Sequence, residues 1–146
     1  MEQSKLYETL KYILIKIKDK NLIWRLERST NLKVQGIDII PRDLDIATDE
    51  EGITFRKELK SHIIKDRYKE EIKAQSLVCN INGIEIEIIY RNNPKVAIDM
   101  FDKIKTIKWH RLDLPILPLE NAIDFYTIIK KPERVRIIQD FLNKNQ

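Results

Sequence analysis

Two short stretches of the 146-residue sequence hold pairs of acidic residues, each pair separated by one aliphatic residue. The pairs are Asp43 with Asp45 and Glu85 with Glu87. Because successive side chains of a β-strand point to opposite faces, both carboxylates of a pair would share one face of a sheet. Mg²⁺ prefers oxygen ligands such as carboxylates, and two such ions can hold the attacking and leaving oxygens of a phosphoryl displacement. If the two strands are neighbours, they predict a divalent-cation site.

The same alternation also fits a sheet with one face in water. Antiparallel sheets often place apolar residues on the buried face and charged residues on the wet one. For Glu85 and Glu87 taken alone, this simpler interpretation is favoured. Asp is uncommon in strands, so for Asp43 and Asp45 the pattern by itself leaves the two interpretations even.

The elements that would position these acids form a mixed α and β fold. Helices are expected where apolar residues recur every three or four positions or where a capping residue opens a run. Alternating or short apolar runs are expected to be strands. The expected helices are 4–19, a short one from Ser29-Thr30 to Gly36, one from Thr48 to about Ser61, 119–130 and 133–142. The expected strands are 22–26, one around Leu44–Ile46, 73–81 and 84–90, with 105–117 extended.

The strongest local signal is Asn82-Gly83 between two apolar runs. This dipeptide favours the two-residue turn of a β-hairpin. The second acidic pair would therefore lie on the second strand of a hairpin, within a small and largely antiparallel sheet. The fold class is α/β in the broad sense (α+β), with helices on the sheet and at the C-terminal end.

Length and composition fit one domain spanning residues 1–146. Hydrophobic residues make up 42% of the chain and charged residues 34%, which is ample apolar material for a core. One cysteine excludes a disulfide framework and a cysteine-based zinc site. No apolar run is long enough to span a membrane, and the first residues lack a signal-peptide pattern. We therefore expect a cytoplasmic protein with no membrane partner.

The formal net charge of +4 would tolerate an anionic partner such as a nucleotide or RNA. A charge-rich, solvated surface is the simpler explanation of that charge. The net charge is therefore compatible with a nucleic-acid partner but does not by itself predict one.

The stretch 24–49, with the later acidic strand, resembles the nucleotidyltransferase superfamily that includes DNA polymerase β, and most of all its minimal members. In that superfamily a strand is followed by a Gly-Ser pair that opens a helix. An Asp-x-Asp strand and a third carboxylate on a following strand come next. Here Trp24–Ser29 corresponds to the first part, Asp43 and Asp45 to the second, and Glu87 to the third.

The C-terminal part adds to this resemblance. The segment 117–120, followed by Tyr126, Lys130 and Arg134, resembles the helical end of these proteins. The resemblance thus covers most of the chain. It implies one nucleotidyltransferase-like domain over residues 1–146, helical from about residue 119.

The activity that the resemblance implies is Mg²⁺- or Mn²⁺-dependent transfer of a nucleoside monophosphate from an NTP to a hydroxyl acceptor, with release of pyrophosphate. Asp43 and Asp45 would hold the metal, and Glu87 would complete the site and help to activate the acceptor. ATP is the expected donor, and a small molecule, a protein or an RNA remain open as acceptor. So short a chain leaves little room for a substrate domain, which suggests a homodimer or a partner chain.

One departure from the superfamily pattern concerns Arg28, which stands where these proteins have glycine. The resemblance implies that the backbone here, with Ser29 and Thr30, receives the nucleotide phosphates. Arg28 would either bind the triphosphate itself or fold onto Asp43 and Asp45 in place of a metal. The second alternative predicts a non-catalytic protein of the same fold that binds a nucleotide, RNA or a partner protein, for example in a toxin–antitoxin pair.

Overall fold

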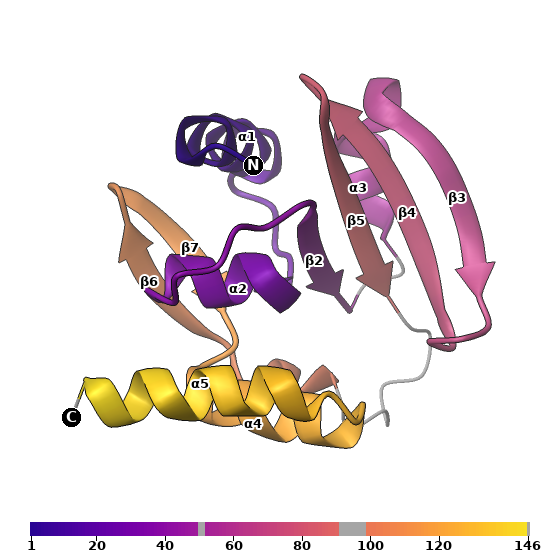
Figure 1. Cartoon of the computed structure of the whole chain (residues 1–146). Helices are drawn as coiled ribbons and strands as arrows, with labels where there is room; N and C mark the ends of the chain where they lie inside the picture. The colour runs from indigo at the N-terminus through magenta and orange to yellow at the C-terminus, as the bar shows by residue number, and fades with distance from the viewer. Residues whose placement is uncertain (50–51, 91–98, 146) are drawn as a thin grey trace.

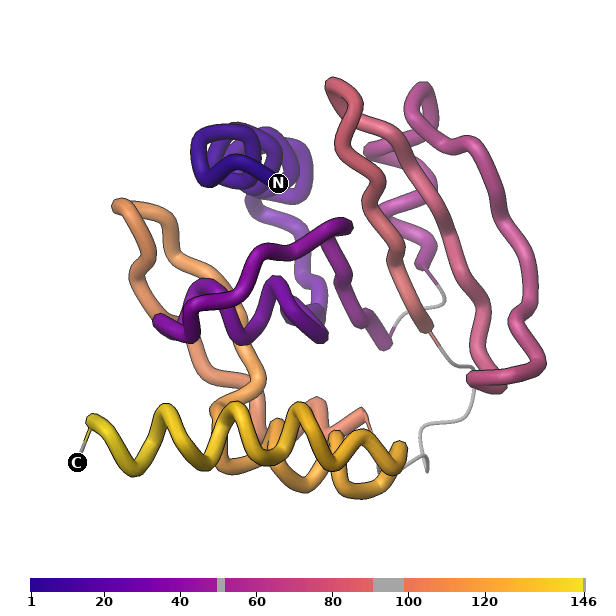
Figure 2. Tube along the Cα trace, in the orientation of Figure 1, coloured from indigo at the N-terminus to yellow at the C-terminus, as the bar shows by residue number. Residues whose placement is uncertain are grey.

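A computed structural model describes residues 1–49, 52–90 and 99–145 of the chain. Figures 1 and 2 show a sheet with helices packed beside and below it. The helices are α1 (Gln3–Ile17), α2 (Arg28–Val34), α3 (Ile53–Glu58), α4 (Leu119–Ile128) and α5 (Pro132–Lys144), and the 3₁₀ turns are η1 (Lys60–His62) and η3 (Phe101–Lys103). The strands are β1 (Trp24–Glu27), β2 (Leu44–Thr48), β3 (Ile63–Lys69), β4 (Ala74–Ile81), β5 (Ile84–Tyr90), β6 (Lys105–Trp109) and β7 (Leu112–Ile116).

Five strands form one sheet in the order β1-β2-β5-β4-β3. The β2–β5 pair is parallel and the other three pairs are antiparallel. Strands β6 and β7 form a separate two-stranded ribbon. The fold is therefore the mixed, largely antiparallel α+β arrangement expected from the sequence.

The two faces of the sheet differ in chemistry because side chains alternate along each strand. One face carries the apolar row Leu26, Ile46, Ile88 and Leu77, which the strand register aligns. This row packs in the main core against apolar residues of α1, α3 and β7. The opposite face carries the charged residues and is called the polar face below.

A second, smaller core joins the C-terminal helices to α2. Leu32 of α2 packs there with Phe125 and Tyr126 of α4 and Ile138 of α5. Asn31 reinforces the contact, because its side-chain amide donates to the Leu117 carbonyl and accepts from the Leu117 amide at 2.9 and 3.0 Å. These contacts hold α4 and α5 beside the start of α2, below the sheet in Figure 1.

Most predicted elements are confirmed within two or three residues, including the hairpin at Asn82-Gly83. Both turn residues have positive φ, 52° and 84°, as such a turn requires. The predicted helix start at Thr48 is wrong, because Thr48 ends β2; Glu50 and Glu51 lie outside the described residues. The α2 cap predicted for Ser29-Thr30 is also wrong: the helix begins at Arg28 with no side-chain cap.

Two elements go beyond what the pattern predicted. Strand β3 was not expected, and the extended segment 105–117 folds back on itself as the β6–β7 hairpin. Among the described residues, no helix has the length and apolar character needed to cross a membrane.

Candidate active site

Three carboxylates lie side by side on the polar face, on three neighbouring strands. The register pairs Glu27 of β1 with Asp45 of β2, and Asp45 with Glu87 of β5. Glu27 and Asp45 are only 5% and 7% exposed. The sheet thus brings the predicted residues Asp45 and Glu87 together, and it adds Glu27 to them.

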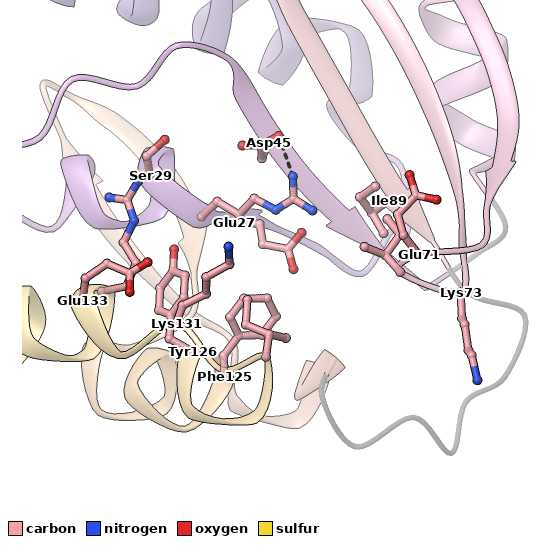
Figure 3. Close-up of a pocket in the computed structure, with 14 residues that line it drawn as sticks. Glu27, Ser29, Asp45, Glu71, Lys73, Ile89, Phe125, Tyr126, Lys131 and Glu133 are labelled. Atoms are coloured by element: carbon pink, nitrogen blue, oxygen red, sulfur yellow. Dashed lines mark ion pairs between the residues drawn. The ribbon is translucent and has the colours of Figure 1, made fainter.

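Arg28 occupies the space between these acids. Its Nη1 atom lies 3.2 Å from Oε1 of Glu87 and 3.9 Å from Oδ1 of Asp45; Figure 3 marks the contact with Asp45. The Arg28 side chain as a whole is 37% exposed, and it lines a cleft of the protein. Arg28 therefore places one positive charge against Asp45 and Glu87.

The backbone of Arg28 is in the left-handed region, at φ 55°. Glycine adopts this conformation without strain, whereas a side chain there costs about 1 kcal/mol or more. A glycine, which the resemblance in the sequence leads one to expect at this position, would therefore suit the turn from β1 into α2. The favourable contacts of the guanidinium with the carboxylates offset this cost.

Glu87 is held from its other side as well. Its Oε2 atom accepts hydrogen bonds from Nζ of Lys69, at 2.9 Å, and from Oγ of Ser76, at 2.7 Å. With Arg28 on Oε1, both oxygens of this carboxylate have protein donors. Burial alone would raise the pKa of Glu87, but the Ser76 and Lys69 hydrogen bonds and the charge of Arg28 lower it below its usual range.

The pKa of Asp45 shifts in the opposite direction. Burial raises its pKa to about 7, and the charges of Glu27, Glu87 and Asp43 add to the rise, while Arg28 opposes it. Burial by itself would lower the pKa of Arg28, but Glu27, Asp45 and Glu87 raise it. Near neutral pH, Asp45 is thus partly protonated beside a charged Arg28 and an ionised Glu87.

Glu27 is fixed by a buried arginine of its own strand. Arg25 is fully buried, and its Nη2 atom lies 3.4 Å from Oε1 of Glu27. Its Nη1 atom donates to the backbone carbonyl of Asp99, and its guanidinium lies over the ring of Phe101. Arg25 thereby connects Glu27, the first of the three neighbouring carboxylates, to the segment that carries η3.

The remaining predicted site residues have different surroundings. Asp43 lies one residue before β2 and is half-buried; its carbonyl accepts a hydrogen bond from the Thr30 hydroxyl at 3.2 Å. Thr30 is fully buried and so joins α2 to the start of β2 rather than facing a ligand. Ser29 lines an open cleft and is half-buried.

This cleft, about 920 Å³ in volume, lies between the polar face and the C-terminal helices. Its floor includes Glu27, Arg28, Ser29 and Asp45. Figure 3 shows Tyr126 and Lys131 rising from the helical side towards Glu27. The other lining residues are Glu71, Ile72, Lys73, Ile89, Phe125, Ile129, Glu133 and Arg134. Burial raises the pKa of Tyr126 to about 12, so its hydroxyl remains a neutral donor to the cleft.

The residues of the site do not fit a divalent cation in this conformation. Within residues 1–49, 52–90 and 99–145, no group of three or more His, Cys, Asp or Glu side chains is arranged to hold one. The guanidinium of Arg28 lies where a cation shared by Asp45 and Glu87 would have to bind. A cation would also have to displace the protein donors on both oxygens of Glu87.

The sequence patterns missed four residues of this network: Arg25, Glu27, Lys69 and Ser76. Arg25 and Glu27 carried an available signal, since they are charged residues two apart in an otherwise apolar run. Lys69 lies on β3, which no apolar pattern marks. Ser76 becomes a partner of Glu87 only through the β4–β5 register, which a single sequence does not display.

Comparison with solved structures supports the architecture. A protein from Thermotoga maritima, described as a "putative nucleotidyltransferase", matches with a TM-score of 0.75 over 99% of this chain and 96% of that chain. The 146-residue chain therefore has a nucleotidyltransferase-like fold, like that neighbour. The sequence identity is 22%, so the likeness extends to the fold and not to the activity. No family model matches the sequence, and no curated protein matches it either.

Proposed function

We propose that this protein binds a nucleotide in its cleft, with Arg28 supplying the positive charge that a divalent cation supplies in the enzymes it resembles. The observation that carries the proposal is the position of the guanidinium between Asp45 and Glu87. A guanidinium is a planar set of donors that suits carboxylate and phosphate oxygens alike. Because Arg28 is partly exposed to the cleft, it can contact an incoming phosphate while keeping its carboxylate partners.

The charge of the cleft fits an anionic ligand. Four cationic side chains (Arg28, Lys73, Lys131 and Arg134) and four acidic ones (Glu27, Asp45, Glu71 and Glu133) line it. These charges would cancel if all were ionised. Since burial raises the pKa of Asp45 to about 7, part of that negative charge is lost near neutral pH, which favours an anionic ligand.

The lining also separates into parts that suit the parts of a nucleotide. Arg28 and Ser29 on the floor and Arg134 on the helical side offer donors to phosphate oxygens. Ile72, Ile89, Phe125 and Ile129 provide apolar surface for a base. Pockets for small ligands commonly combine such an apolar lining with a few polar groups that fix orientation.

Metal-dependent transfer from an NTP to a hydroxyl acceptor is the second candidate. It is favoured by the juxtaposition of Asp45 and Glu87 from separate strands, and it requires Arg28 to leave both of them. The expectations of Mg²⁺ or Mn²⁺, of ATP as donor, of an acceptor and of a homodimer or partner chain belong to this candidate and stay predictions.

Titration calorimetry with ATP tests the proposal. Wild type is titrated once in EDTA and once in MgCl₂, and we expect similar dissociation constants in the two buffers. Arg28→Met should weaken binding in EDTA by roughly tenfold to a hundredfold, the effect of losing a charge-assisted hydrogen bond of about 1.5–3 kcal/mol. Arg136→Met, an exposed change of the same kind on α5, is the matched control and should bind like wild type.

Three other results of the calorimetry would contradict the proposal. Binding that requires MgCl₂ would favour the second candidate and contradict ours. Absence of ATP binding in both buffers would overturn the proposal, as would equal losses in Arg28→Met and Arg136→Met.

A further inference from the structure

The edge strand β3 carries a row of cations on the polar face. Lys65, Arg67 and Lys69 pair in the β3–β4 register with Val78, Ser76 and Ala74. The Ser76 hydroxyl and the Lys69 ammonium both contact Glu87, which places the alternate residues of β3 on the same face as the site. We call Lys65, Arg67 and Lys69 the basic row.

The outer two members of the basic row are available to a ligand. Lys65 and Arg67 are exposed, and in the part of the chain that the structure describes neither side chain has a hydrogen-bond or ion-pair partner. Asp66, between them, is on the opposite face, where it pairs with Arg56 at 2.7 Å. The two cations are therefore not neutralised by their neighbours on the strand.

The basic row leads into the cleft. Its inner member, Lys69, contacts Glu87, which in turn contacts Arg28 on the cleft floor. The turn that follows β3 contributes Glu71, Ile72 and Lys73 to the lining. In Figure 1, β3 lies at the edge of the sheet, while α3 lies behind β4 and β5. A ligand lying along β3 would thus have one end at the cleft.

We propose that the basic row binds the phosphate backbone of a single-stranded nucleic acid whose end reaches the cleft. Alternate residues of a strand are about 6.8 Å apart, so the row presents regularly spaced charges to a chain that carries one charge per repeating unit. Lysine and arginine contacts to phosphate oxygens position a strand without reading its sequence. This inference rests on the proposed function only for the position of that end, because the row itself does not depend on ATP binding.

Fluorescence anisotropy with labelled oligo(U) and oligo(dT) tests the inference. The variant Lys65→Gln/Arg67→Gln removes the two unpaired charges. Lys5→Gln/Lys11→Gln, two exposed lysines of α1, is the control with the same change in net charge. Each phosphate contact to a single strand contributes about −0.7 to the slope of log K against log salt.

We expect the row variant to make that slope about 1.4 less negative and to bind on the order of tenfold to thirtyfold more weakly at about 0.1 M salt. The α1 variant should keep the wild-type slope. ATP titrations on the row variant should match wild type, because neither substituted residue lines the cleft.

Equal losses in the two double variants, or no loss in the row variant, would overturn the inference. Absence of oligonucleotide binding by wild type would leave Lys65 and Arg67 as charges that keep an exposed edge strand from pairing with other chains. Equally tight, row-dependent binding of a labelled oligoglutamate would assign the row to an acidic polypeptide instead. Row-dependent oligonucleotide binding without ATP binding would support this inference while contradicting the proposed function.

Discussion

The charged residues on the polar face of the sheet behave differently at its two ends. At the β1 end, Arg25 and Glu27 are buried and paired, and they form one network with Arg28, Asp45 and Glu87 through contacts or neighbouring charge. At the β3 end, Lys65 and Arg67 are exposed and lack such contacts. The comparison shows that the buried charged groups of this face contact one another, whereas Lys65 and Arg67 at its exposed edge do not.

The largest expected difference between the two ends concerns their arginines. Arg25→Met breaks a buried pair and leaves Glu27 without its guanidinium, which should lower the free energy of unfolding by about 3–5 kcal/mol. Arg67→Met, the matched change at the exposed end, should alter it by less than about 0.5 kcal/mol. Urea unfolding followed by circular dichroism measures both values, and similar losses in the two variants would contradict the comparison.

Within β5, the same contrast holds between two glutamates on one face. Glu87→Gln gives up the charge that Arg28 and Lys69 share and should cost about 2 kcal/mol at neutral pH. Because the pKa of Glu87 is lowered in the folded protein, its stabilisation exists above the ordinary value of 4.5 and is lost as pH falls through the lowered pKa. The deficit of the variant should therefore shrink as pH falls below 4.5.

The free energy of unfolding of Glu87→Gln is measured at several pH values. Glu85→Gln is the control, since Glu85 is exposed two residues earlier on β5. Its free energy of unfolding at neutral pH should differ from that of wild type by less than about 0.5 kcal/mol. A pH-independent deficit in Glu87→Gln would show that packing, rather than the charge of Glu87, accounts for the effect.

Asp45, the neighbour of Glu87, should affect the pH dependence of stability in the opposite direction. Its pKa is raised from 3.8 to about 7, so wild type loses stability as pH rises between these values. Asp45→Asn removes this loss and should be more stable than wild type above pH 7, by at least about 1–2 kcal/mol, since the raised pKa already includes the opposing attraction of Arg28.

The advantage of Asp45→Asn should vanish towards pH 4, and thermal unfolding at several pH values measures it. Asp113→Asn, the control at a 66% exposed side chain of β7 that pairs with Lys108, should change the free energy of unfolding by less than about 1 kcal/mol. A variant that is less stable than wild type at pH 8 would contradict the burial of a raised-pKa carboxyl at this position.

The smallest expected effect tests the backbone at Arg28. Because its φ is 55°, Arg28→Gly should be about 1 kcal/mol more stable than Arg28→Ala. At Lys33, inside α2, the order should reverse, since glycine costs about 1 kcal/mol relative to alanine within a helix. The same order at both positions, measured by chemical unfolding, would contradict a left-handed backbone at Arg28.

Local sequence patterns predicted the parts of the fold that they control. The apolar spacing of α1 and the Asn82-Gly83 turn each specify an element without help from distant residues. The β6–β7 turn was missed because His110 and Arg111 adopt positive φ, 46° and 72°, without the glycine or asparagine that usually marks such a turn. Strand β3 was missed because pairing with β4, rather than an apolar pattern of its own, makes this charged edge segment a strand.

The candidate site was predicted in part for the same reason. The Asp-x-Asp pattern and the second acidic strand identified Asp45 and Glu87, and their pairing followed once β2 and β5 were neighbours. The choice that the sequence left open, whether Arg28 would turn towards the acids, depends on the backbone at one residue and on burial from three strands. No pattern within a single segment contains that information.

The central claim is that Arg28 holds the place of a cation between Asp45 and Glu87, and titration with Mn²⁺ followed by electron paramagnetic resonance tests it most directly. Wild type should leave the Mn²⁺ signal free. Arg28→Gly, which removes the guanidinium without straining the backbone, should bind one ion, and Asp45→Asn in the same background should release it. Tight binding of Mn²⁺ by wild type, abolished by Asp45→Asn, would contradict the account.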